Sequence, residues 1–229
     1  MYEKLQLDYE CESCYNTVAK VMREHGLLQN RNRPKGLTKA DKEAQKSDNL
    51  IKRDFTSQEP NKKGVTDIAE FAAKDGKLYV SGLFDCFDNY CLGLTIEQHM
   101  RAELVIETYN QATKKHYLRG AISHSDRGSQ YTSEEFRRVL AKHGITQSMN
   151  SAAGRCHDNA KCESMWGRGK VEIMQCYDTR KMTCEELGKV IYGYYLDYWN
   201  NRRICSAIGG MPPAVKRGAY YEMLADMAA

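Results

Sequence analysis

YLRGAISHSDRGSQY, residues 117–131, places an aspartate directly behind a predicted strand. Residues 117–123 are typical of a short β-strand, and Asp126 opens a loop that contains a glycine. A carboxylate at such a strand end is either a turn former or one ligand of a metal site. The segments on either side of this stretch distinguish the two interpretations.

The surrounding segments predict an α/β fold. Apolar segments bounded by turn residues predict strands at residues 64–71, 78–84, 90–96, 117–123 and 145–149. Apolar residues at helical spacing predict helices at 12–25, 102–115, 133–143, 158–177 and 183–199. Ser133 is the expected N-cap of the third helix. Two strands that closely follow the first predict an antiparallel meander, and the full order predicts a mixed five-stranded sheet flanked by helices. The ribonuclease H-like fold is one member of this class.

Length and composition limit the class of protein. The 229 residues suffice for one large domain with a small appendage, and a hydrophobic content of 41% suits a packed core. Apolar runs stay well below the roughly 20 residues that cross a bilayer. The N-terminal sequence lacks an apolar stretch behind a basic cluster, so we expect neither a signal peptide nor a membrane partner. An intracellular protein is therefore expected.

Positive charge is concentrated near the N-terminus, although the net charge of the chain is only +4. Residues 20–53 contain ten Lys and Arg residues against four Asp and Glu residues. This segment is either a solvated basic linker or an arm that contacts phosphates, because clustered cations bind nucleic acid by displacing its counterions.

The nine cysteines do not predict a metal site or a disulfide framework. Only Cys11 and Cys14 have the spacing of metal ligands, and no second Cys or His pair lies nearby in the sequence. We expect reduced thiols.

Three acidic residues stand where burial of a lone charge is costly. Asp67 lies inside the first strand, Asp126 follows the fourth, and Glu163 lies on the long helix 158–177. If the first and fourth strands are neighbours at the sheet centre, the helix can bring Glu163 over their ends. Three converging carboxylates repel one another unless a divalent cation lies among them, and hard oxygen ligands suit Mg²⁺ or Mn²⁺.

Two such ions can activate an attacking oxygen and stabilise a leaving oxygen in phosphodiester chemistry. For each acid taken alone, a helix cap or a turn residue remains the alternative. Asp85 and Asp88 are competitors for the metal site, but they bracket a predicted turn and are expected to be turn formers.

HSDRGSQYTSEEFRRVLAKHGITQSM (124–149), followed by DNAKCESMWGRGK (158–170), resembles the integrase catalytic core of bacterial insertion-sequence transposases, the group most similar to retroviral integrases. The resemblance extends to NLIKRDFTSQEPNKKGVTDIAEF (49–71) and YYLDYWNNRRICSAIGGMPPAVK (194–216), so it covers about residues 49–217. It implies a ribonuclease H-like fold.

The resemblance also implies the functional residues. The family's Asp-Asp-Glu triad falls on Asp67, Asp126 and Glu163, which would be the catalytic residues and the ligands of Mg²⁺ or Mn²⁺, with two ions expected. The candidates for DNA contacts are Lys170, Arg168, Arg127 and Asn159.

The expected domain organisation follows from the same resemblance. Residues 1–30 would be a remnant of a helix-turn-helix region, 31–60 a basic linker, 61–217 the catalytic core and 218–229 a tail. The implied function is metal-dependent cleavage of DNA ends and strand transfer during transposition. The implied partners are element ends, target DNA and further copies of the chain, in the bacterial cytoplasm near the nucleoid.

Some positions depart from the family's usual residues. Gly64 stands in place of an aromatic residue, Ala69 in place of a threonine and Cys205 in place of a histidine. Gly167 and Gly169 are expected to weaken the catalytic helix, each by about 1 kcal/mol relative to alanine. These features motivate the alternative function, a decayed or truncated copy that binds DNA or a sister transposase without cutting. A ribonuclease that acts on hybrids is a third possibility, since fold alone does not choose the substrate.

Overall fold

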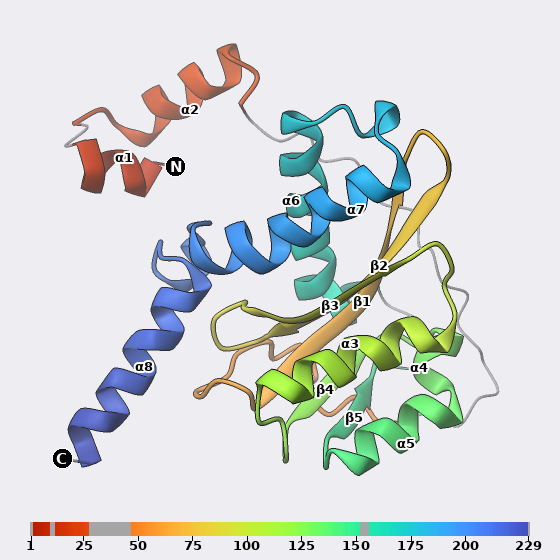
Figure 1. Cartoon of the computed structure of the whole chain (residues 1–229). Helices are drawn as coiled ribbons and strands as arrows, with labels where there is room; N and C mark the ends of the chain where they lie inside the picture. Colours follow the sequence, from red (N-terminus) through yellow and green to blue (C-terminus); the bar gives the residue numbers. More distant parts are fainter. Residues whose placement is uncertain (1, 10–11, 28–46, 152–155, 229) are drawn as a thin grey trace.

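A mixed five-stranded sheet with the order β3-β2-β1-β4-β5 forms the centre of the protein (Figure 1). The computed structural model describes residues 2–9, 12–27, 47–151 and 156–228. The strands are β1 (Lys63–Ala72), β2 (Lys77–Asp85), β3 (Cys91–Glu97), β4 (Ile122–Ser125) and β5 (Thr146–Met149). The first three form the predicted antiparallel meander, and β4 runs parallel to both β1 and β5.

The fourth strand begins later than predicted. Residues 117–121 lie outside the strand, because Gly120 adopts a left-handed φ of 80° and Ala121 N donates to Leu118 O across a turn. The prediction of a strand at 117–123 is therefore wrong in its bounds, and the strand instead ends directly before Asp126.

Helices complete the chain. They are α1 (Tyr2–Tyr9), α2 (Tyr15–Glu24), α3 (Ala102–Lys115), α4 (Ser129–Thr132), α5 (Glu134–Lys142), α6 (Ala160–Cys176), α7 (Cys184–Gly193) and α8 (Pro213–Ala228). The 3₁₀ turns are η1 (Cys156–Asn159), η2 (Thr179–Lys181) and η4 (Ser206–Ile208), and α7 continues into a π-helical turn, η3 (Tyr194–Trp199). Ser133 accepts a hydrogen bond from Phe136 N, which confirms the predicted N-cap of α5. The short α4 and the long α8 were not predicted.

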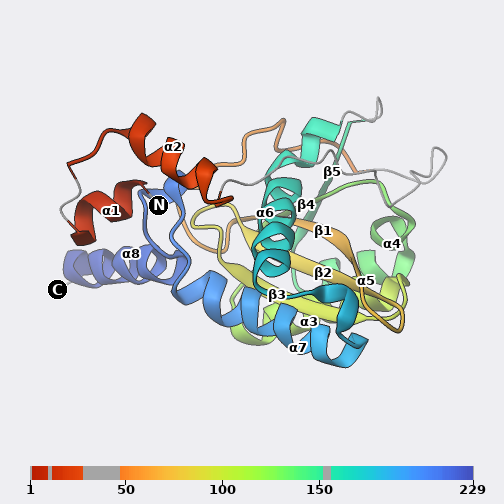
Figure 2. The ribbon, with the colours of Figure 1, turned by 90° about the horizontal axis from the view of Figure 1, so that it is seen from above.

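Each face of the sheet is covered by its own helices (Figure 2). Ile68 and Leu83 lie in one buried cluster with residues of α3, α4 and α5. Val65, Val80 and Phe84 lie in the other with residues of α6, α7 and η3. Because successive residues of a strand face opposite sides, coverage of both faces makes these strands almost continuously apolar.

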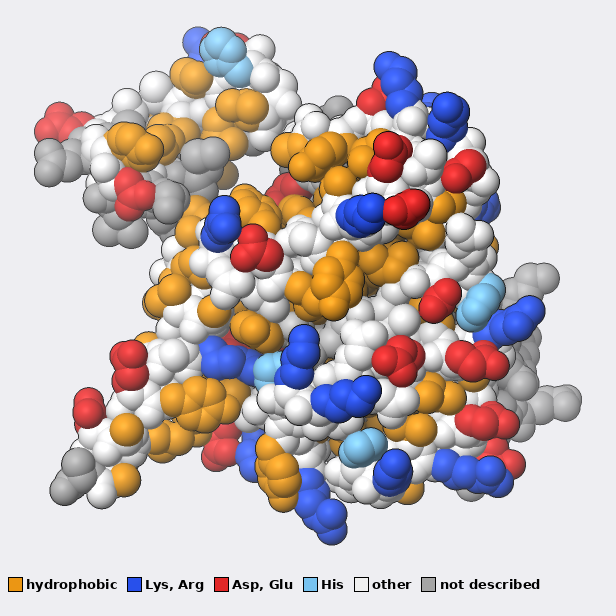
Figure 3. Space-filling view, in the orientation of Figure 1, with side chains coloured by type: hydrophobic (Ala, Val, Ile, Leu, Met, Phe, Trp, Pro, Cys, Tyr) orange, Lys and Arg blue, Asp and Glu red, His pale blue; other side chains and the backbone are white. Residues whose placement is uncertain are grey.

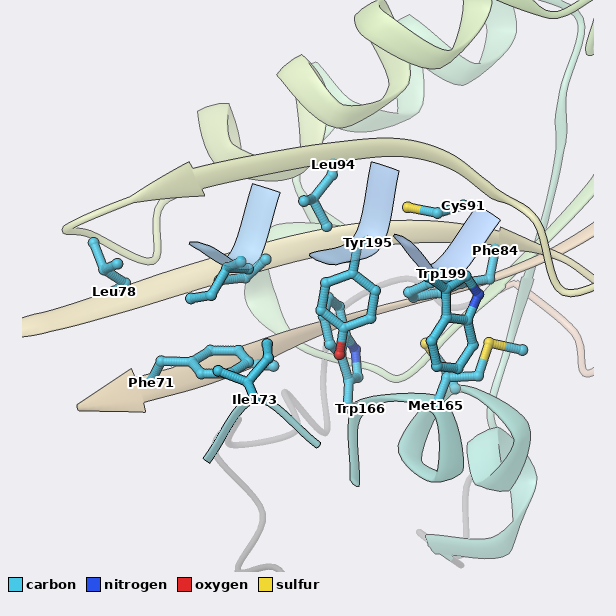
Figure 4. Close-up of a cluster of buried hydrophobic side chains, with 14 of the residues drawn as sticks. Phe71, Leu78, Phe84, Cys91, Leu94, Met165, Trp166, Ile173, Tyr195 and Trp199 are labelled. Atoms are coloured by element: carbon cyan, nitrogen blue, oxygen red, sulfur yellow. The ribbon is translucent and has the colours of Figure 1, made fainter. Parts of the chain in front are cut away.

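Helix α6 packs closely against η3 over the sheet (Figure 4). Trp166 meets Tyr195 edge to face, with ring centres 4.9 Å apart, and both rings meet Phe84. A Cβ at Gly169 would overlap the Tyr195 hydroxyl, whereas a Cβ at Gly167 would have nothing within 4 Å. Gly169 is therefore required by the packing of α6, and Gly167 is not.

We expect the two helix glycines to respond oppositely to alanine. Gly167→Ala should raise the free energy of unfolding by up to about 1 kcal/mol, because alanine has the higher helix propensity. Gly169→Ala should lower it by about 1–3 kcal/mol, because the new methyl group displaces Tyr195. Urea denaturation measures both, and equal shifts for the two variants would contradict the packing described here.

The C-terminal helix is attached to the sheet through Arg217. Asp85 and Asp88, both fully buried in the β2–β3 turn, accept hydrogen bonds from Phe87 N and Tyr90 N, which confirms them as turn formers. Their remaining oxygens accept from the Arg217 guanidinium at 2.5 and 2.7 Å. Burial and the charge of Asp88 raise the pKa of Asp85, and Arg217 opposes this rise.

Removal of the Arg217 charge should be strongly destabilising. Arg217→Met leaves two buried carboxylates without their cation, which should lower the free energy of unfolding by about 3–5 kcal/mol. Arg202→Met is the matched control, because its ion pair with Asp197 is exposed and should contribute less than about 1 kcal/mol. Similar losses for the two variants in urea denaturation would refute this assignment.

The ends of the chain extend from the core. Figures 1 and 2 show α1 and α2 beside the core and α8 projecting away from it. Hydrophobic side chains are visible along α8 in Figure 3. The exposed large hydrophobic residues of this helix are Val215, Tyr221, Met223, Leu224 and Met227. The predicted division after residue 217 falls inside this helix. Among the described helices, none has the length and apolar character needed to cross a membrane.

Candidate active site

The sheet itself brings two of the three predicted carboxylates together. Strands β1 and β4 are parallel, with Val65 opposite His124, and Asp67 and Asp126 each follow two residues later. Neighbouring strands lie about 4.8 Å apart, so the continued register sets the two aspartates side by side at the end of β4. Asp126 accepts a hydrogen bond from Gly128 N at 2.9 Å, which fixes its side chain as the chain turns into α4.

Helix α6 brings the third carboxylate over this strand end. Asn159, at its N-terminus, donates from Nδ2 to the carbonyl oxygen of Thr66 at 3.1 Å. One turn after Glu163, Trp166 rests on Gly82, where a Cβ would lie only 2.9 Å from the indole ring. Gly82 is the β2 partner of Asp67, so the same turn of α6 lies over Asp67. Glu163 itself is exposed on the first turn of the helix.

The electrostatics of Asp67 reflect this convergence. Burial, together with the charges of Asp126 and Glu163, raises the pKa of Asp67 to about 8. Lys170 acts in the opposite direction. The Tyr131 hydroxyl lies 3.4 Å from the Thr66 hydroxyl, and burial and the charges of both aspartates raise the pKa of Tyr131. A buried phenol therefore lies beside the carboxylates.

The donor set suits a hard divalent cation. Asp67 is a buried carboxylate whose ionisation two neighbouring carboxylates oppose, so a cation among the three would stabilise them, and carboxylate oxygens are the ligands of Mg²⁺ and Mn²⁺. In the part of the chain that the structure describes, three or more His, Cys, Asp or Glu side chains are nowhere gathered into a preformed metal site. The first of the two cysteines with metal-ligand spacing, Cys11, lies outside the described residues.

The four residues predicted to contact DNA lie in different surroundings. Lys170 faces β1, because its ammonium lies 5.3 Å from the centre of the Phe71 ring. Burial lowers the pKa of Lys170, and the charges of Asp67 and Glu70 oppose this lowering. The Arg127 Nε donates to the Asn150 carbonyl at 2.5 Å.

Neither Asn159 nor Arg168 lies on an open surface beside Asp67, Asp126 and Glu163. Asn159 is only 2% exposed, and its Oδ1 has no hydrogen-bond partner among the described residues. Arg168 is exposed and lines a separate cleft on another side of α6. The structure therefore brings Lys170 to the triad, while the DNA contacts of all four residues stay predictions.

One residue of the site was missed. The His124 Nε2 lies 2.8 Å from the Asp158 carbonyl and its Nδ1 lies 2.8 Å from the Ser148 hydroxyl, so this side chain joins β4 to β5 and to the turn that leads into α6. Burial lowers the pKa of His124, so the neutral ring is favoured: Nε2 donates to the carbonyl and Nδ1 accepts. Its place two residues before Asp126 in the quoted motif is the signal in the sequence.

The departures from the family's residues leave this arrangement in place. At Gly64 a Cβ would lie 3.0 Å from Leu83 Cδ1, so an aromatic side chain here requires Leu83 to move. Ala69 is 2% exposed within the core. Cys205 is also buried, and its sulfur accepts a hydrogen bond from Asn89 Nδ2 at 3.2 Å.

Several known proteins are similar to this chain in sequence. Residues 57–156 match the family model described as Integrase core domain. An uncharacterized transposase-like protein of Haemophilus influenzae is 39% identical over 169 residues, which cover 73% of this chain and 76% of the relative. The putative transposase InsK for insertion sequence element IS150 of Escherichia coli is 35% identical over 178 residues, which cover 77% of this chain and 62% of that protein.

The fold is also found among solved structures. The catalytic core domain of HTLV-2 integrase in complex with magnesium, in its trimeric form, superposes with a TM-score of 0.54 at 16% identity. The superposition covers 70% of this chain and 99% of the other. This likeness confirms the predicted ribonuclease H-like fold.

Neutralising Asp67 should stabilise the metal-free protein. Asp67→Asn keeps the shape of the side chain but removes a carboxyl group whose ionisation is opposed by burial and by two other carboxylates. We expect the melting temperature in EDTA to rise, by about 2–4 °C for each kcal/mol gained. Mg²⁺ or Mn²⁺ should raise the melting temperature of the parent chain and not that of the variant. A variant less stable than its parent in EDTA would contradict this picture of the site.

Proposed function

Because this chain belongs to the family of bacterial insertion-sequence transposases with an integrase core, we propose that it cleaves DNA at the ends of its element and joins them to target DNA. The observation that carries this proposal is the electrostatic convergence of Asp67, Asp126 and Glu163 from a strand, a strand end and a helix. Cleavage and joining are both displacements at phosphorus, so one site can serve both.

Asp67, Asp126 and Glu163 would hold Mg²⁺ or Mn²⁺, with two ions in the proposed site. Bound there, the ions would supply activation of the attacking oxygen and stabilisation of the leaving oxygen. The chain supplies the positions of its oxygens: β1 fixes Asp67, the hydrogen bond from Gly128 N fixes Asp126, and the rigid helix α6 carries Glu163.

Lys170 is a cation that interacts with Asp67, and its position suits it to bind a DNA phosphate. Lys170 lies two helical turns after Glu163, and burial of its ammonium lowers its pKa while Asp67 and Glu70 raise it. An ammonium in this place would hold a DNA phosphate near the carboxylates and reduce their repulsion of it. Such a contact sets affinity rather than sequence choice.

The proposed partners are the element ends, the target DNA and further copies of the chain. Joining two ends to one target requires two sites, so we propose a homo-oligomer assembled on DNA in the cytoplasm.

Gly169 was one of the features that motivated the alternative of a decayed copy. Because Gly169 is needed for the contact of α6 with Tyr195, this glycine does not indicate decay.

Strand transfer of a labelled DNA end tests the proposal. With Mg²⁺ or Mn²⁺ the parent chain should give joined product, and Glu163→Gln should reduce the rate by at least about a hundredfold, because the amide keeps the size and loses the charge. Glu185→Gln, at an exposed position of α7, is the matched control and should leave the rate unchanged.

The other outcomes separate the alternatives. Bound DNA without product from the parent chain would favour the copy that binds without cutting. Cleavage of an RNA–DNA hybrid in place of strand transfer would favour the ribonuclease.

A further inference from the structure

A second cationic site lies on another side of α6. A cleft of about 520 Å³ is formed by residues 53–57, the β2–β3 turn, α6 and the chain from η3 to α8. Four cations and one acid line it: Arg53, Lys161, Arg168, Lys216 and Asp54. We call it the basic cleft. On α6, Lys161 and Arg168 lie about 140–160° around the helix axis from Glu163, because each residue advances by about 100°. The basic cleft is therefore distinct from the carboxylate site.

Lys161 is the most constrained of these cations. Its ammonium donates to the carbonyl oxygens of Phe55 at 3.0 Å and Cys86 at 2.7 Å, which come from two different walls of the cleft. An ammonium has three donors, so one remains for a ligand. Among the described residues it forms no ion pair, and the charges of Asp85 and Asp88 act on it only from a longer distance. A partly buried cation held only by neutral oxygens favours an incoming anion.

Two further cations are available to the same anion. The Lys216 ammonium donates to the Phe87 carbonyl at 2.9 Å and lies 4.6 Å from the centre of the Phe87 ring. The exposed Arg168 guanidinium forms no ion pair within the residues that the structure describes. Lys161, Lys216 and Arg168 thus present positive charge that is not taken up by an ion pair with a described residue.

The one acidic residue among the described residues that line the cleft is already neutralised. Asp54 forms an ion pair with Lys63 at 2.9 Å and accepts a hydrogen bond from the Thr56 hydroxyl. Arg53 pairs with the buried Asp158 at 2.7 Å, and its left-handed φ of 67° is a costly conformation for a residue other than glycine. The wall of the cleft is thereby held in place at a local cost in free energy.

The geometry points to the basic cleft as a binding site for the phosphodiester backbone of a DNA strand. Spaced cations with spare donors match the repeated charges of such a backbone, and they gain affinity by releasing its counterions. The cleft volume lies in the range of ligand pockets, so it can hold more than a single phosphate. Lys216 covers the face of the Phe87 ring, so the site offers charge rather than a platform for base stacking.

This inference rests on the proposed function and deepens it. DNA would contact α6 on two sides, at the carboxylates where it reacts and at the basic cleft where it is held. The contact is with the backbone, so it should be independent of sequence.

DNA binding as a function of salt tests the site without catalysis. In EDTA, Arg168→Glu and Lys216→Glu should each weaken binding of a labelled duplex several-fold and lower the slope of log K against log[salt] by about 1. Arg138→Glu is the matched control: it makes the same charge change on α5, at the opposite face of the sheet, and its residue is 72% exposed. Melting temperatures of all three variants confirm that they fold.

The outcomes separate this inference from the proposed function. Cleft variants that bind DNA like Arg138→Glu, or a parent chain that does not bind DNA, would overturn the inference. If the parent chain still joins DNA ends in the first of these cases, the proposed function stands. Binding that depends on Arg168 and Lys216 without any joined product would support the cleft and remove the proposed activity.

Discussion

Two parallel strands hold two carboxylates side by side, and much of the structure keeps them in that position. Burial of the Asp67 carboxyl opposes folding at this point, and repulsion from Asp126 adds to it. The strands cannot move apart, because their register is fixed on both sides: β1 by the β2 ladder and β4 by β5. The neutral His124 ring adds a side-chain connection from β4 to the segment before α6. A charged site is thus held by neutral hydrogen bonds and apolar packing.

Helix α6 has to satisfy two demands at once. One side packs densely enough that a methyl group at Gly169 does not fit and a Cβ at Gly82 would meet Trp166. The remaining surface carries Glu163 towards the strand ends and Arg168 into the basic cleft. Close apolar packing fixes the height and rotation of the helix, and with them the direction of every charged side chain that it carries. A small shift of this helix would therefore disturb both charged sites together.

The sequence predicted those parts of the structure that depend on local pattern. The meander, α3 and the Ser133 cap follow from apolar spacing and turn residues, and the structure confirms them. The adjacency of the first and fourth strands was expected from the topology of the fold class, and it is also observed. The predicted bounds of β4 were wrong because Leu118 and Ala121 are buried in a turn outside the strand, so apolar character alone misled the prediction.

Partners that lie far apart in the sequence could not be predicted. Nothing local indicates that Arg217 neutralises Asp85 and Asp88, or that the Lys161 ammonium donates to Phe55 and Cys86. Gly169 was interpreted as a weakness of the helix, because its contact with Tyr195 becomes visible only in three dimensions.

The attachment through Arg217 also defines how short the chain can be made. The two aspartates of the β2–β3 turn depend on a cation more than a hundred residues later in the sequence. A fragment that ends before Arg217 would therefore keep all five strands but lose the positive charge that neutralises this turn.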